Sequence, residues 1–350
     1  MIGTGATEGA STCYLSLGAN LGKREQTIRL ALEEIAHTDG VELAGVSSFY
    51  ETAPWGVANQ PDFINAAAKV YTVLSPMELL RQMQRIEGKL GRVRHEHWGA
   101  RTMDIDLLHM PGVASDTEEL RLPHPYLSER AFVLRPLAQI ADSLVIDRKT
   151  VRGHLEVCKD AGEVRRAKGS PMDFGLCLIA CVDDTWGLGK DGKLLFHLSA
   201  DLKHFRELTY GHTVILGRKT LRTFPGGKLL EGRRHILLSR SINDGPEHSA
   251  GCSVVSSLAS LWETLERSPE QERFFVIGGA TVYRELLPYC CEAGITLVHE
   301  RREADCFLPR LDMRADFSLQ SCQKMEENGV EMEFRSYRRR MWQRHESFHE

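Results

Sequence analysis

Two hydrophobic periodicities alternate along the first 110 residues. Apolar positions recur at helical spacing from Ile28 to Ile35 and again from Leu79 to Leu90. Around them lie short apolar runs typical of strands, at residues 14–18, 41–52, 63–74 and 103–110. The resulting order of strand, helix, two strands, helix and strand predicts an α+β ferredoxin-like sandwich.

The second predicted helix carries its own start signal. Ser75 is a favoured N-cap residue, Pro76 suits the first helical position, and Glu78 follows three residues after the cap. We therefore expect this helix to begin directly after Ser75.

From residue 172 onward, strand patterns are interleaved with helical patterns. Apolar runs typical of strands occupy residues 174–182, 212–217, 233–239, 273–279 and 295–300. Helical patterns at 199–210 and 281–287 fall between them. This alternation predicts an α/β domain with a mostly parallel central sheet.

A stretch without periodicity separates the two patterns. Residues 158–171 are charged and small, as in a linker. A chain of 350 residues also exceeds one ordinary core and favours two domains. We therefore expect a flexible N-terminal tail, a first domain, a linker, a second domain and a C-terminal tail, at residues 1–12, 13–157, 158–171, 172–339 and 340–350.

Composition narrows the classes of function. The chain has 44 Lys and Arg against 48 Asp and Glu, so its net charge of −4 gives no basic field for nucleic acid or an anionic membrane. The N-terminus lacks the pattern of a secretory signal, and no run is long enough to span a bilayer. We expect a cytoplasmic protein whose nine cysteines, without CxxC spacing, are reduced core thiols. A homo-oligomer is left open.

Asp104 and Asp106 interrupt the last apolar run of the first half. Side chains two apart in a strand point to the same face, so these carboxylates project together. Neighbouring carboxylates repel unless a proton or a cation lies between them, and such oxygen ligands suit Mg²⁺ that carries substrate phosphates. An edge strand with one solvated face is the alternative explanation.

Cations precede the two aspartates. Arg92, Arg94 and Arg101 lie just upstream, with Trp98 among them. Guanidinium groups match phosphate oxygens, and a metal with arginines is typical of phosphoryl transfer, so a nucleoside triphosphate is the expected ligand. The loop 18–23 is no Walker P-loop, because three residues instead of four separate its glycines and no Ser or Thr follows the lysine.

Five segments of the first half resemble 6-hydroxymethyl-7,8-dihydropterin pyrophosphokinase: SLGANLG, SSFYETAPWG, FINAA, GRVRHEHWGARTMDIDLL and LPHPYLSERAFVL. The resemblance covers residues 13–155. That family moves the terminal pyrophosphoryl group of ATP to the hydroxymethyl group of the dihydropterin and releases AMP. The resemblance implies that Asp104 and Asp106 ligate two Mg²⁺ ions and that Arg92 and Arg101, as catalytic residues, stabilise charge on the transferring group.

The same resemblance implies two sets of binding residues. The expected ATP-binding residues are Glu87, Arg94, Trp98, His124 and Arg130. The expected pterin-binding residues are Thr52, Pro54, Trp55, Gly56, Phe63, Asn65 and Phe132, with Asn65 bonding the ring edge and the phenylalanines stacking on its face.

Two positions depart from the family pattern. Glu119 stands where an Arg is frequent, with Arg121 nearby as a substitute. Phe63 replaces a frequent Tyr, which keeps the stacking and loses a hydroxyl. Both metal ligands remain.

In the second half, Asp201 lies in the first turn of the predicted helix 199–210. The helix dipole alone favours an acidic residue there. However, Phe196, Leu198 and Phe205 flank it, so the carboxylate is expected against an apolar wall. A buried carboxylate can pair with the amidine-like edge of a pterin.

Three loops of the second half carry groups suited to a dinucleotide. Residues 278–279, both glycine, end a strand before a helix, where backbone can approach a pyrophosphate closely. Residues 217–220, GRKT, repeat the pattern, and Ser239 and Arg240 follow another strand. Arginines and a serine at strand ends favour the 2′-phosphate of NADPH over the ribose diol of NADH.

The segments WGLGKDG, GRKT, LLSR, VIGGATVY and DCFLP follow one another as in dihydrofolate reductase, which the chain resembles over residues 172–338. The resemblance implies a dihydrofolate-reductase-like fold and reduction of dihydrofolate by NADPH. In this reaction Asp201 fixes the pterin and promotes protonation of N5 through water. The expected folate-binding residues are Leu178, Phe205, Phe224, Leu230 and Arg233, the last of which pairs with the glutamate α-carboxylate. The expected NADPH-binding residues are Ala180, Leu188, Gly217, Arg218, Lys219, Thr220, Ser239, Arg240, Ile277, Gly278, Gly279, Ala280, Thr281 and Tyr283.

Two departures bear on the reductase chemistry. Leu195 and Phe196 stand where the family has Pro-Trp, so an indole N–H that orders a water is missing. Alignment of ITLVHE places Val298 where the family has the Thr that bonds the catalytic carboxylate. We expect activity with an altered rate or pH dependence.

The sequence therefore predicts a bifunctional enzyme of folate biosynthesis. Its expected cofactors are Mg²⁺ and NADPH, and its expected substrates are ATP, 6-hydroxymethyl-7,8-dihydropterin and dihydrofolate. The alternative is an active pyrophosphokinase fused to a reductase half that acts on another dihydropterin or only binds it. If that pterin is smaller, Arg233 is dispensable.

Overall fold

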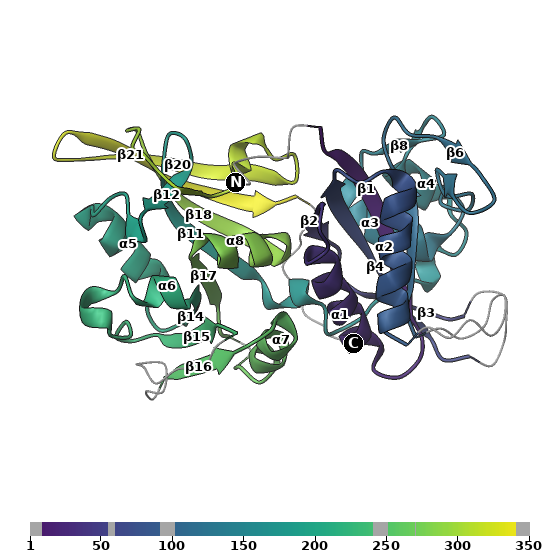
Figure 1. The fold of residues 1–350 in the computed structure, drawn as a ribbon, viewed down its shortest axis with the longest axis horizontal. Coiled ribbons are helices and arrows are strands. Elements are labelled where there is room, and N and C mark those ends of the chain that lie inside the picture. The colour runs from purple at the N-terminus through teal and green to yellow at the C-terminus, as the bar shows by residue number, and fades with distance from the viewer. Residues whose placement is uncertain (1–8, 55–59, 92–101, 241–250, 270, 341–350) are drawn as a thin grey trace. The chain divides into compact units, whose positions relative to one another are not determined.

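The computed structural model describes residues 9–54, 60–91, 102–240, 251–269 and 271–340. These residues fall into two compact units, which divide the chain between Asp173 and Phe174 (Figure 1).

The first unit combines helices with a mainly antiparallel set of strands. Its strands are β1 (Ser11–Ala19), β2 (Val41–Val46), β3 (Tyr50–Thr52), β4 (Phe63–Thr72), β5 (Asp104–His109), β6 (Ser115–Asp116), β7 (Arg121–Leu122), β8 (Val145–Ile146), β9 (Lys149–Thr150) and β10 (Arg165–Arg166). Its helices are α1 (Arg24–Ala36), α2 (Pro76–Lys89), α3 (Ala131–Ala141) and α4 (Val151–Val157).

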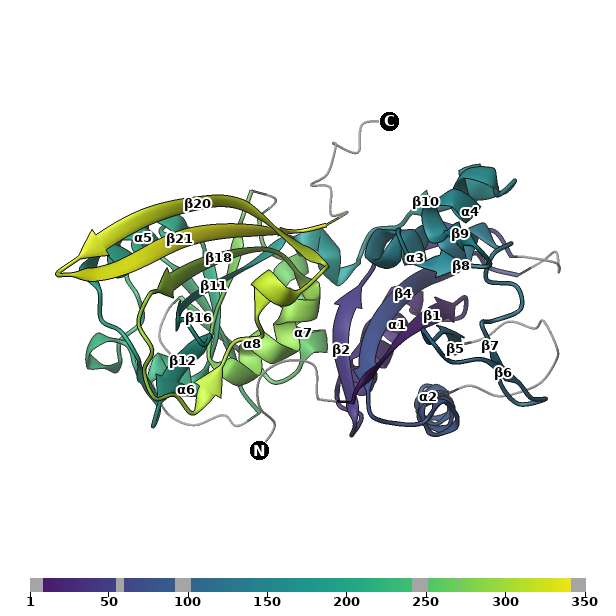
Figure 2. The same cartoon turned by 90° about the horizontal axis from the view of Figure 1, so that it is seen from above.

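Six described strands of this unit form one sheet. Its order is β10-β3-β4-β1-β5, with β2 also paired to β4, and these pairings are antiparallel. Helices α2 and α3 lie on opposite sides of the sheet (Figure 2). Strand β1 thus lies between the strands that carry Asn65 and Asp104.

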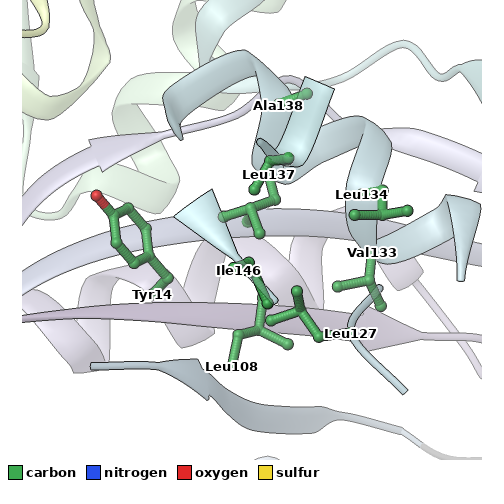
Figure 3. Close-up of a cluster of buried hydrophobic side chains, with 10 residues drawn as sticks. Tyr14, Leu108, Leu127, Val133, Leu134, Leu137, Ala138 and Ile146 are labelled. Carbon is green, nitrogen blue, oxygen red and sulfur yellow. The ribbon is translucent and has the colours of Figure 1, made fainter. Parts of the chain in front are cut away.

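Alternation along β1 distributes its side chains between the two faces of the sheet. Leu15 and Leu17 point to one face, whereas Tyr14 points to the other. Figure 3 shows the cluster that Tyr14 joins, in which β4 and β5 meet α3 and its neighbours. Its other buried members are Ala67, Leu108, Leu127, Val133, Leu134, Leu137, Ala138, Ile146 and Val151. Hydrophobic periodicity does not predict α3, because apolar residues occupy most of its positions and Pro136 lies inside it.

The predicted start of α2 is confirmed. The Ser75 hydroxyl accepts the Glu78 backbone N–H at 3.3 Å, and the Glu78 carboxylate accepts the Ser75 N–H at 2.8 Å. This reciprocal pair is a capping box. The expected strand at 41–52, in contrast, is divided into β2 and β3, and β1 begins inside the expected N-terminal tail.

Residues 158–171 are not a structureless linker. They contain β10, which pairs with β3. The Ala167 N–H donates to the Phe49 carbonyl at 2.9 Å, and the Arg29 guanidinium donates to the Gly169 carbonyl at 2.5 and 2.8 Å. Backbone pairing at a sheet edge needs no hydrophobic pattern, so the charged composition concealed this strand. The segment belongs to the first unit.

The second unit is built on strands that alternate with helices. Its strands are β11 (Leu176–Asp183), β12 (Gly187–Lys190), β13 (Lys193–Leu194), β14 (Thr213–Gly217), β15 (Arg234–Leu238), β16 (Cys252–Val255), β17 (Phe274–Gly278), β18 (Cys290–Val298), β19 (Cys306–Phe307), β20 (Phe317–Glu327) and β21 (Val330–Arg339). Its helices are α5 (Ser199–Thr209), α6 (Arg218–Leu221), α7 (Leu258–Glu266) and α8 (Ala280–Leu286).

Eight of the strands described in this unit form one sheet, in the order β16-β15-β14-β17-β11-β18-β21-β20. The pairs from β16 to β18 are parallel, and β21 and β20 add an antiparallel hairpin at the other edge. Strands β13, β12 and β19 form a small separate sheet. The parallel arrangement brings the carboxyl ends of β14, β15 and β17 to one edge.

Membrane and disulfide features are absent from the described parts of the chain. None of the described helices combines the length and apolarity needed to cross a bilayer. The nine cysteines, all of them described, form no disulfide. Burial raises the pKa of Cys13 to about 12, in keeping with a core thiol. Cys322, however, is exposed, so the expectation of core thiols fails there.

Removal of the segment after α4 should destabilise the first unit. Residues 1–157 lack β10 and both Arg29 hydrogen bonds, whereas residues 1–173 keep them. At about 1 kcal/mol for each hydrogen bond, the shorter chain should lose about 2–3 kcal/mol in its free energy of unfolding. Urea denaturation of the two chains measures the difference, and equal stabilities would contradict the assignment of this segment to the first unit.

Candidate active sites

Three neighbouring strands bring predicted kinase residues to one face of the first sheet. Gly18 of β1 pairs with Asn65 of β4 on one side and with Asp104 of β5 on the other. Residues directly opposite in antiparallel strands share a face, and each strand spacing is about 4.8 Å. The backbones of Asn65 and Asp104 thus lie about 10 Å apart across Gly18. A Cβ at position 18 would lie 3.6 Å from Oδ1 of Asn65 and 4.0 Å from the Phe63 ring, so position 18 faces both side chains.

The two aspartates of β5 are held by a buried glutamate. Ile105 is buried between Asp104 and Asp106, which are both partly exposed. Glu87 of α2 is only 2% exposed, and its Oε1 accepts the Ile105 N–H at 2.7 Å. Glu87 therefore positions the strand segment that carries both carboxylates. Its contact with ATP stays a prediction.

A histidine and an arginine lie in the electrostatic field of these carboxylates. Burial lowers the pKa of His124, Arg130 lowers it further, and Asp104 opposes them. Nδ1 of His124 accepts the Tyr126 N–H at 3.4 Å, as a neutral imidazole can. Burial likewise lowers the pKa of Arg130, while Asp106 and Asp104 raise it. The structure thus brings together four predicted residues: Asp104, Asp106, His124 and Arg130. The guanidinium of Arg130 is the positive charge near the two carboxylates.

Two carboxylates form a small donor set for a metal. Across the described residues, no group of three or more His, Cys, Asp or Glu side chains has the arrangement of a metal site. Mg²⁺ commonly takes one or two protein carboxylates and completes its shell with phosphate oxygens and water. The aspartates therefore fit Mg²⁺ that arrives with a phosphate substrate, rather than a metal held by protein alone.

Two of the predicted pterin residues, Thr52 and Phe63, lie near Asn65. Asn65 is 3% exposed, and its amide donates to Oγ1 of Thr52 at 2.9 Å. Thr52 in turn pairs with Phe63 across β3 and β4. Pro54 follows β3, and Phe132 packs against the α3 cluster. Asn65, Thr52 and Phe63 thus lie together, and a buried amide beside an aromatic ring suits a flat polar ring.

The loop after β1 and the start of α1 contact the chain before β4. The side chain of Asn20 donates to Oε1 of Gln60 at 3.1 Å and to the Pro61 carbonyl at 3.4 Å. Arg24 donates to the Asp62 carbonyl at 2.6 Å. These contacts fix the chain that leads into β4.

Glu119, which departs from the kinase pattern, and the nearby Arg121 both lie in ion pairs. Glu119 pairs with Arg81 of α2 at 2.5 Å, and Arg121 pairs with Asp116 at 3.3 Å. The predicted substitution by Arg121 stays a prediction.

In the second unit, Asp201 lies on α5 above the end of β18. Burial raises the pKa of Asp201, and a hydrogen bond from Thr296 opposes the rise. The assignment of Val298 to this position was therefore wrong. Thr296 and Val298 are two apart in β18 and share a face, so an alignment shifted by two residues preserves the hydrophobic pattern and conceals the error.

Phe196 occupies the place where the dihydrofolate reductase pattern has a tryptophan. It is 6% exposed and clusters with Val298 and Met332. The Arg302 guanidinium lies 4.2 Å from the centre of its ring, a cation–π arrangement. The same guanidinium donates to the Glu300 carboxylate at 2.9 and 3.1 Å and to the Leu195 carbonyl, so this cation is held in place. No indole N–H is available, and a fixed guanidinium covers the ring instead.

The predicted apolar lining of the folate site is largely assembled. Phe205, Phe224 and Leu230 pack against one buried cluster that includes Cys177 and Ile277. Leu178 is not a member of this cluster, because alternation along β11 turns its side chain to the opposite face from Cys177 and Ile179. Its contact with folate stays a prediction. The same alternation turns the Ala180 side chain away from this cluster.

A second arginine accompanies Arg233. The Arg233 guanidinium lies 5.7 Å from the Phe205 ring centre, and its Nε donates to Thr209 at 3.1 Å. Burial and then the charge of Arg206 lower the pKa of Arg233. Both guanidiniums also lie near Tyr210, at 5.6 and 5.8 Å from its ring centre. Arg206 was not among the predicted residues. Its position directly after Phe205, on the same amphipathic helix, could have indicated that it lies near Arg233.

The predicted cofactor loops meet at the carboxyl edge of the sheet. Leu216 of β14 pairs with Gly278 of β17, so the loops that begin at Gly217 and Gly279 are neighbours. Gly278 has φ 107°, and a Cβ there would lie 2.9 Å from the Tyr283 ring, so only glycine fits.

Side chains hold these cofactor loops in place. Nε of Arg218 donates to Oγ of Ser239 at 3.2 Å, which joins the ends of β14 and β15. The Tyr283 hydroxyl donates to the Ile179 carbonyl at 2.6 Å. Arg240 is exposed beside Ser239, and Lys219 is exposed next to Arg218. Of the remaining predicted residues, Ala280 and Thr281 begin α8, Thr220 lies in α6, Ile277 in β17 and Leu188 in β12.

Known proteins match both halves of the chain. Residues 14–142 match the family model described as 7,8-dihydro-6-hydroxymethylpterin-pyrophosphokinase. A 2-amino-4-hydroxy-6-hydroxymethyldihydropteridine pyrophosphokinase of Methylorubrum extorquens is 44% identical over 149 residues, which are 43% of this chain and 94% of the relative. The chain belongs to this pyrophosphokinase family. A pyrophosphokinase of Haemophilus influenzae is 41% identical over 140 residues, 40% of this chain and 88% of the relative.

A second family model matches the other half. Residues 175–339 match the model described as dihydrofolate reductase. The chain is therefore a fusion of a pyrophosphokinase domain and a dihydrofolate reductase domain, a bifunctional enzyme of the folate pathway. A solved dihydrofolate reductase from Enterococcus faecalis, in complex with NADP(H) and RAB-propyl, is 28% identical, covers 48% of this chain and 98% of that chain, and has a TM-score of 0.42.

Some predicted residues of the pyrophosphokinase domain lie outside the described residues. They are Trp55 and Gly56 of the pterin set, and Arg92, Arg94, Trp98 and Arg101 of the phosphate set. Conversely, sequence reasoning missed Thr296, Arg206 and Arg302, which the structure places around the reductase site.

Replacement of Thr296 by Val should raise the pKa of Asp201 further. The hydrogen bond from Thr296 favours the charged carboxylate, so its loss favours the protonated form. Carboxyl titration by NMR of protein with ¹³C-labelled aspartate, with Asp201→Asn to assign the signal, measures the midpoint. Val298→Thr serves as the matched control. A titration that moves for Val298→Thr and not for Thr296→Val would restore the original assignment.

Proposed function

We propose that the first domain transfers a pyrophosphoryl group from ATP to 6-hydroxymethyl-7,8-dihydropterin and that the second reduces 7,8-dihydrofolate to tetrahydrofolate with NADPH. The single observation that carries the first proposal is the pairing of Gly18 with both Asn65 and Asp104, which supports a pterin-binding role for Asn65 and a metal-binding role for Asp104 on one face of the sheet. The second rests on the partly buried Asp201 with its hydrogen bond from Thr296.

In the first domain, transfer joins the pterin hydroxymethyl oxygen to the β-phosphorus of ATP and breaks that phosphorus's bond to the α-phosphate oxygen, so AMP leaves. Asn65 orients the pterin, and Phe63 stacks on its ring. Asp104 and Asp106 would hold two Mg²⁺ ions, which supply charge neutralisation on the phosphates when bound. Arg130 adds a fixed positive charge beside these carboxylates, and neutral His124 offers a hydrogen-bond donor to ATP.

In the second domain, NADPH supplies the hydride when bound. Asp201 pairs with the pterin edge and, because its pKa is raised, holds or relays a proton toward N5. Phe205, Phe224 and Leu230 exclude water around the ring. Arg218, Ser239 and Arg240 lie where a 2′-phosphate would approach, which supports NADPH over NADH.

A reductase that acts on a smaller dihydropterin is the second candidate. The adjacent guanidiniums of Arg233 and Arg206 favour a substrate with carboxylates instead. Two neighbouring positive charges repel each other, and an anion bound between them removes this repulsion. A glutamate tail supplies such an anion, and a small pterin does not.

The fold also accords with these assignments. The order β5-β1-β4-β2 of the first sheet supports a ferredoxin-like description, and five parallel pairs in the second sheet support a mostly parallel core.

Asp104→Asn should lower the rate of AMP release by about 10²–10³-fold, because one charged oxygen ligand at the transferring group is lost. Dihydrofolate-dependent NADPH oxidation by the same sample should be unchanged. The control is Asp116→Asn, which makes the same change of charge on an exposed part of the first domain. AMP release at the normal rate from Asp104→Asn would refute the metal assignment.

Asp201→Asn should lower dihydrofolate-dependent NADPH oxidation by about 10²-fold while AMP release continues, because an amide cannot exchange a proton with N5. Absorbance at the NADPH band measures the rate. A wild-type chain that oxidises NADPH with a small dihydropterin and not with dihydrofolate would favour the second candidate. Undiminished dihydrofolate reduction by the variant would exclude Asp201 from the chemistry.

A further inference from the structure

The hairpin of β20 and β21 reaches the helix that carries Asp201. Asn328 and Gly329 join the two strands with φ 54° and 82°. Positive φ at both central residues is characteristic of the tight hairpin turn that Asn-Gly favours. Glu327 and Val330 form the last strand pair before this turn. The turn chemistry therefore fixes where the Glu327 side chain begins.

Glu327 caps α5 from outside the helix. One carboxylate oxygen accepts the Ser199 N–H at 3.0 Å, and the other accepts the Ala200 N–H at 2.8 Å. Leu198, the residue at the N-cap position, contributes no side-chain hydrogen bond. The first N–H groups of a helix need such acceptors, and their positive end attracts an anion. These two hydrogen bonds lower the pKa of Glu327, so the cap is charged at neutral pH.

Apolar packing holds the rest of the helix against the same hairpin. Met332 is buried in the cluster of Phe196 and Val298, and Phe334 packs against that cluster. The His204 ring of α5 stacks on Phe334 with 4.2 Å between ring centres. One face of α5 is thus fixed by β21, and its N-terminal end is fixed by Glu327.

Charged and titratable groups from several elements surround Asp201. Burial raises its pKa most, Thr296 of β18 and His204 of α5 lower it, and Glu327 of β20 raises it. Cys181 of β11 and Tyr283 of α8 also interact with Asp201, and burial is the main reason that their own pKa values are raised. Glu327 is the negatively charged member of this set.

We propose that Glu327 is a positioning residue of the reductase: its carboxylate fixes the start of α5 and supplies a negative charge that favours the protonated form of Asp201. This inference rests on the proposed reductase function. Reduction of dihydrofolate consumes one proton, so its rate falls as the pH rises past the range in which the proton donor is protonated. Glu327 thereby extends that range toward higher pH, although it touches neither substrate nor cofactor.

Glu327→Gln tests the proposal because glutamine keeps an acceptor oxygen for one helix N–H and loses the charge. The midpoint of the Asp201 carboxyl titration should fall by about half a pH unit, which is about a threefold change in the protonated fraction above the midpoint. The falling limb of the kcat profile against pH should move down by the same amount, with little change in the KM for dihydrofolate. The ¹³C-aspartate NMR titration and NADPH oxidation measure the two.

Two further variants separate charge from fold. Glu326→Gln changes the net charge equally at the preceding, exposed hairpin residue, and both midpoints should stay at the wild-type value. Glu327→Asp keeps the charge and should keep both midpoints nearer to wild type than Glu327→Gln does, even if thermal unfolding shows that the shorter side chain weakens the cap.

Unmoved midpoints in Glu327→Gln, or equal shifts in Glu326→Gln, would overturn the proposal. A wild-type chain without dihydrofolate reduction would sink the proposed reductase alone, because the NMR titration reports on the cap without any substrate.

Discussion

The cost of keeping a carboxylate away from water is the constraint on which both sites depend. An ionised carboxylate needs a cation, hydrogen-bond donors or a proton when solvent is withdrawn. In the pyrophosphokinase domain, Asp104 and Asp106 stay partly exposed and lie near Arg130. In the reductase domain, Asp201 is partly buried and its pKa rises. The same functional group thus lies near a guanidinium in one domain and is made easier to protonate in the other.

Backbone pairing accounts for the precision of both arrangements. In the first sheet, register across Gly18 determines the interval between Asn65 and Asp104, and the buried Glu87 holds the strand at Ile105. In the second sheet, β18 presents Thr296 to Asp201, while the β20–β21 hairpin presents Glu327 to the start of α5. In each case a strand register, once fixed, positions groups that are distant in sequence.

Local signals allowed much of this to be predicted from the sequence. The capping box at Ser75, the alternating strands and the paired aspartates each depend on residues close together in the chain. The errors arose where tertiary pairing decides. The partner of Asp201 was assigned to position 298 instead of 296, because side chains on one face of a strand repeat every two residues. Strand β10 was missed because its charged residues carry no hydrophobic pattern. The Asn328-Gly329 signal was available, but nothing local indicates that Glu327 reaches Ser199.

We propose that one chain carries both chemistries, each on its own domain. To test this, the full chain is purified and one sample is assayed twice, for AMP release with ATP, Mg²⁺ and 6-hydroxymethyl-7,8-dihydropterin, and for NADPH oxidation with dihydrofolate. We expect both rates to be substrate-dependent and to co-purify in constant ratio. Constant AMP release with NADPH oxidation that is lost on further purification, or the reverse, would contradict it.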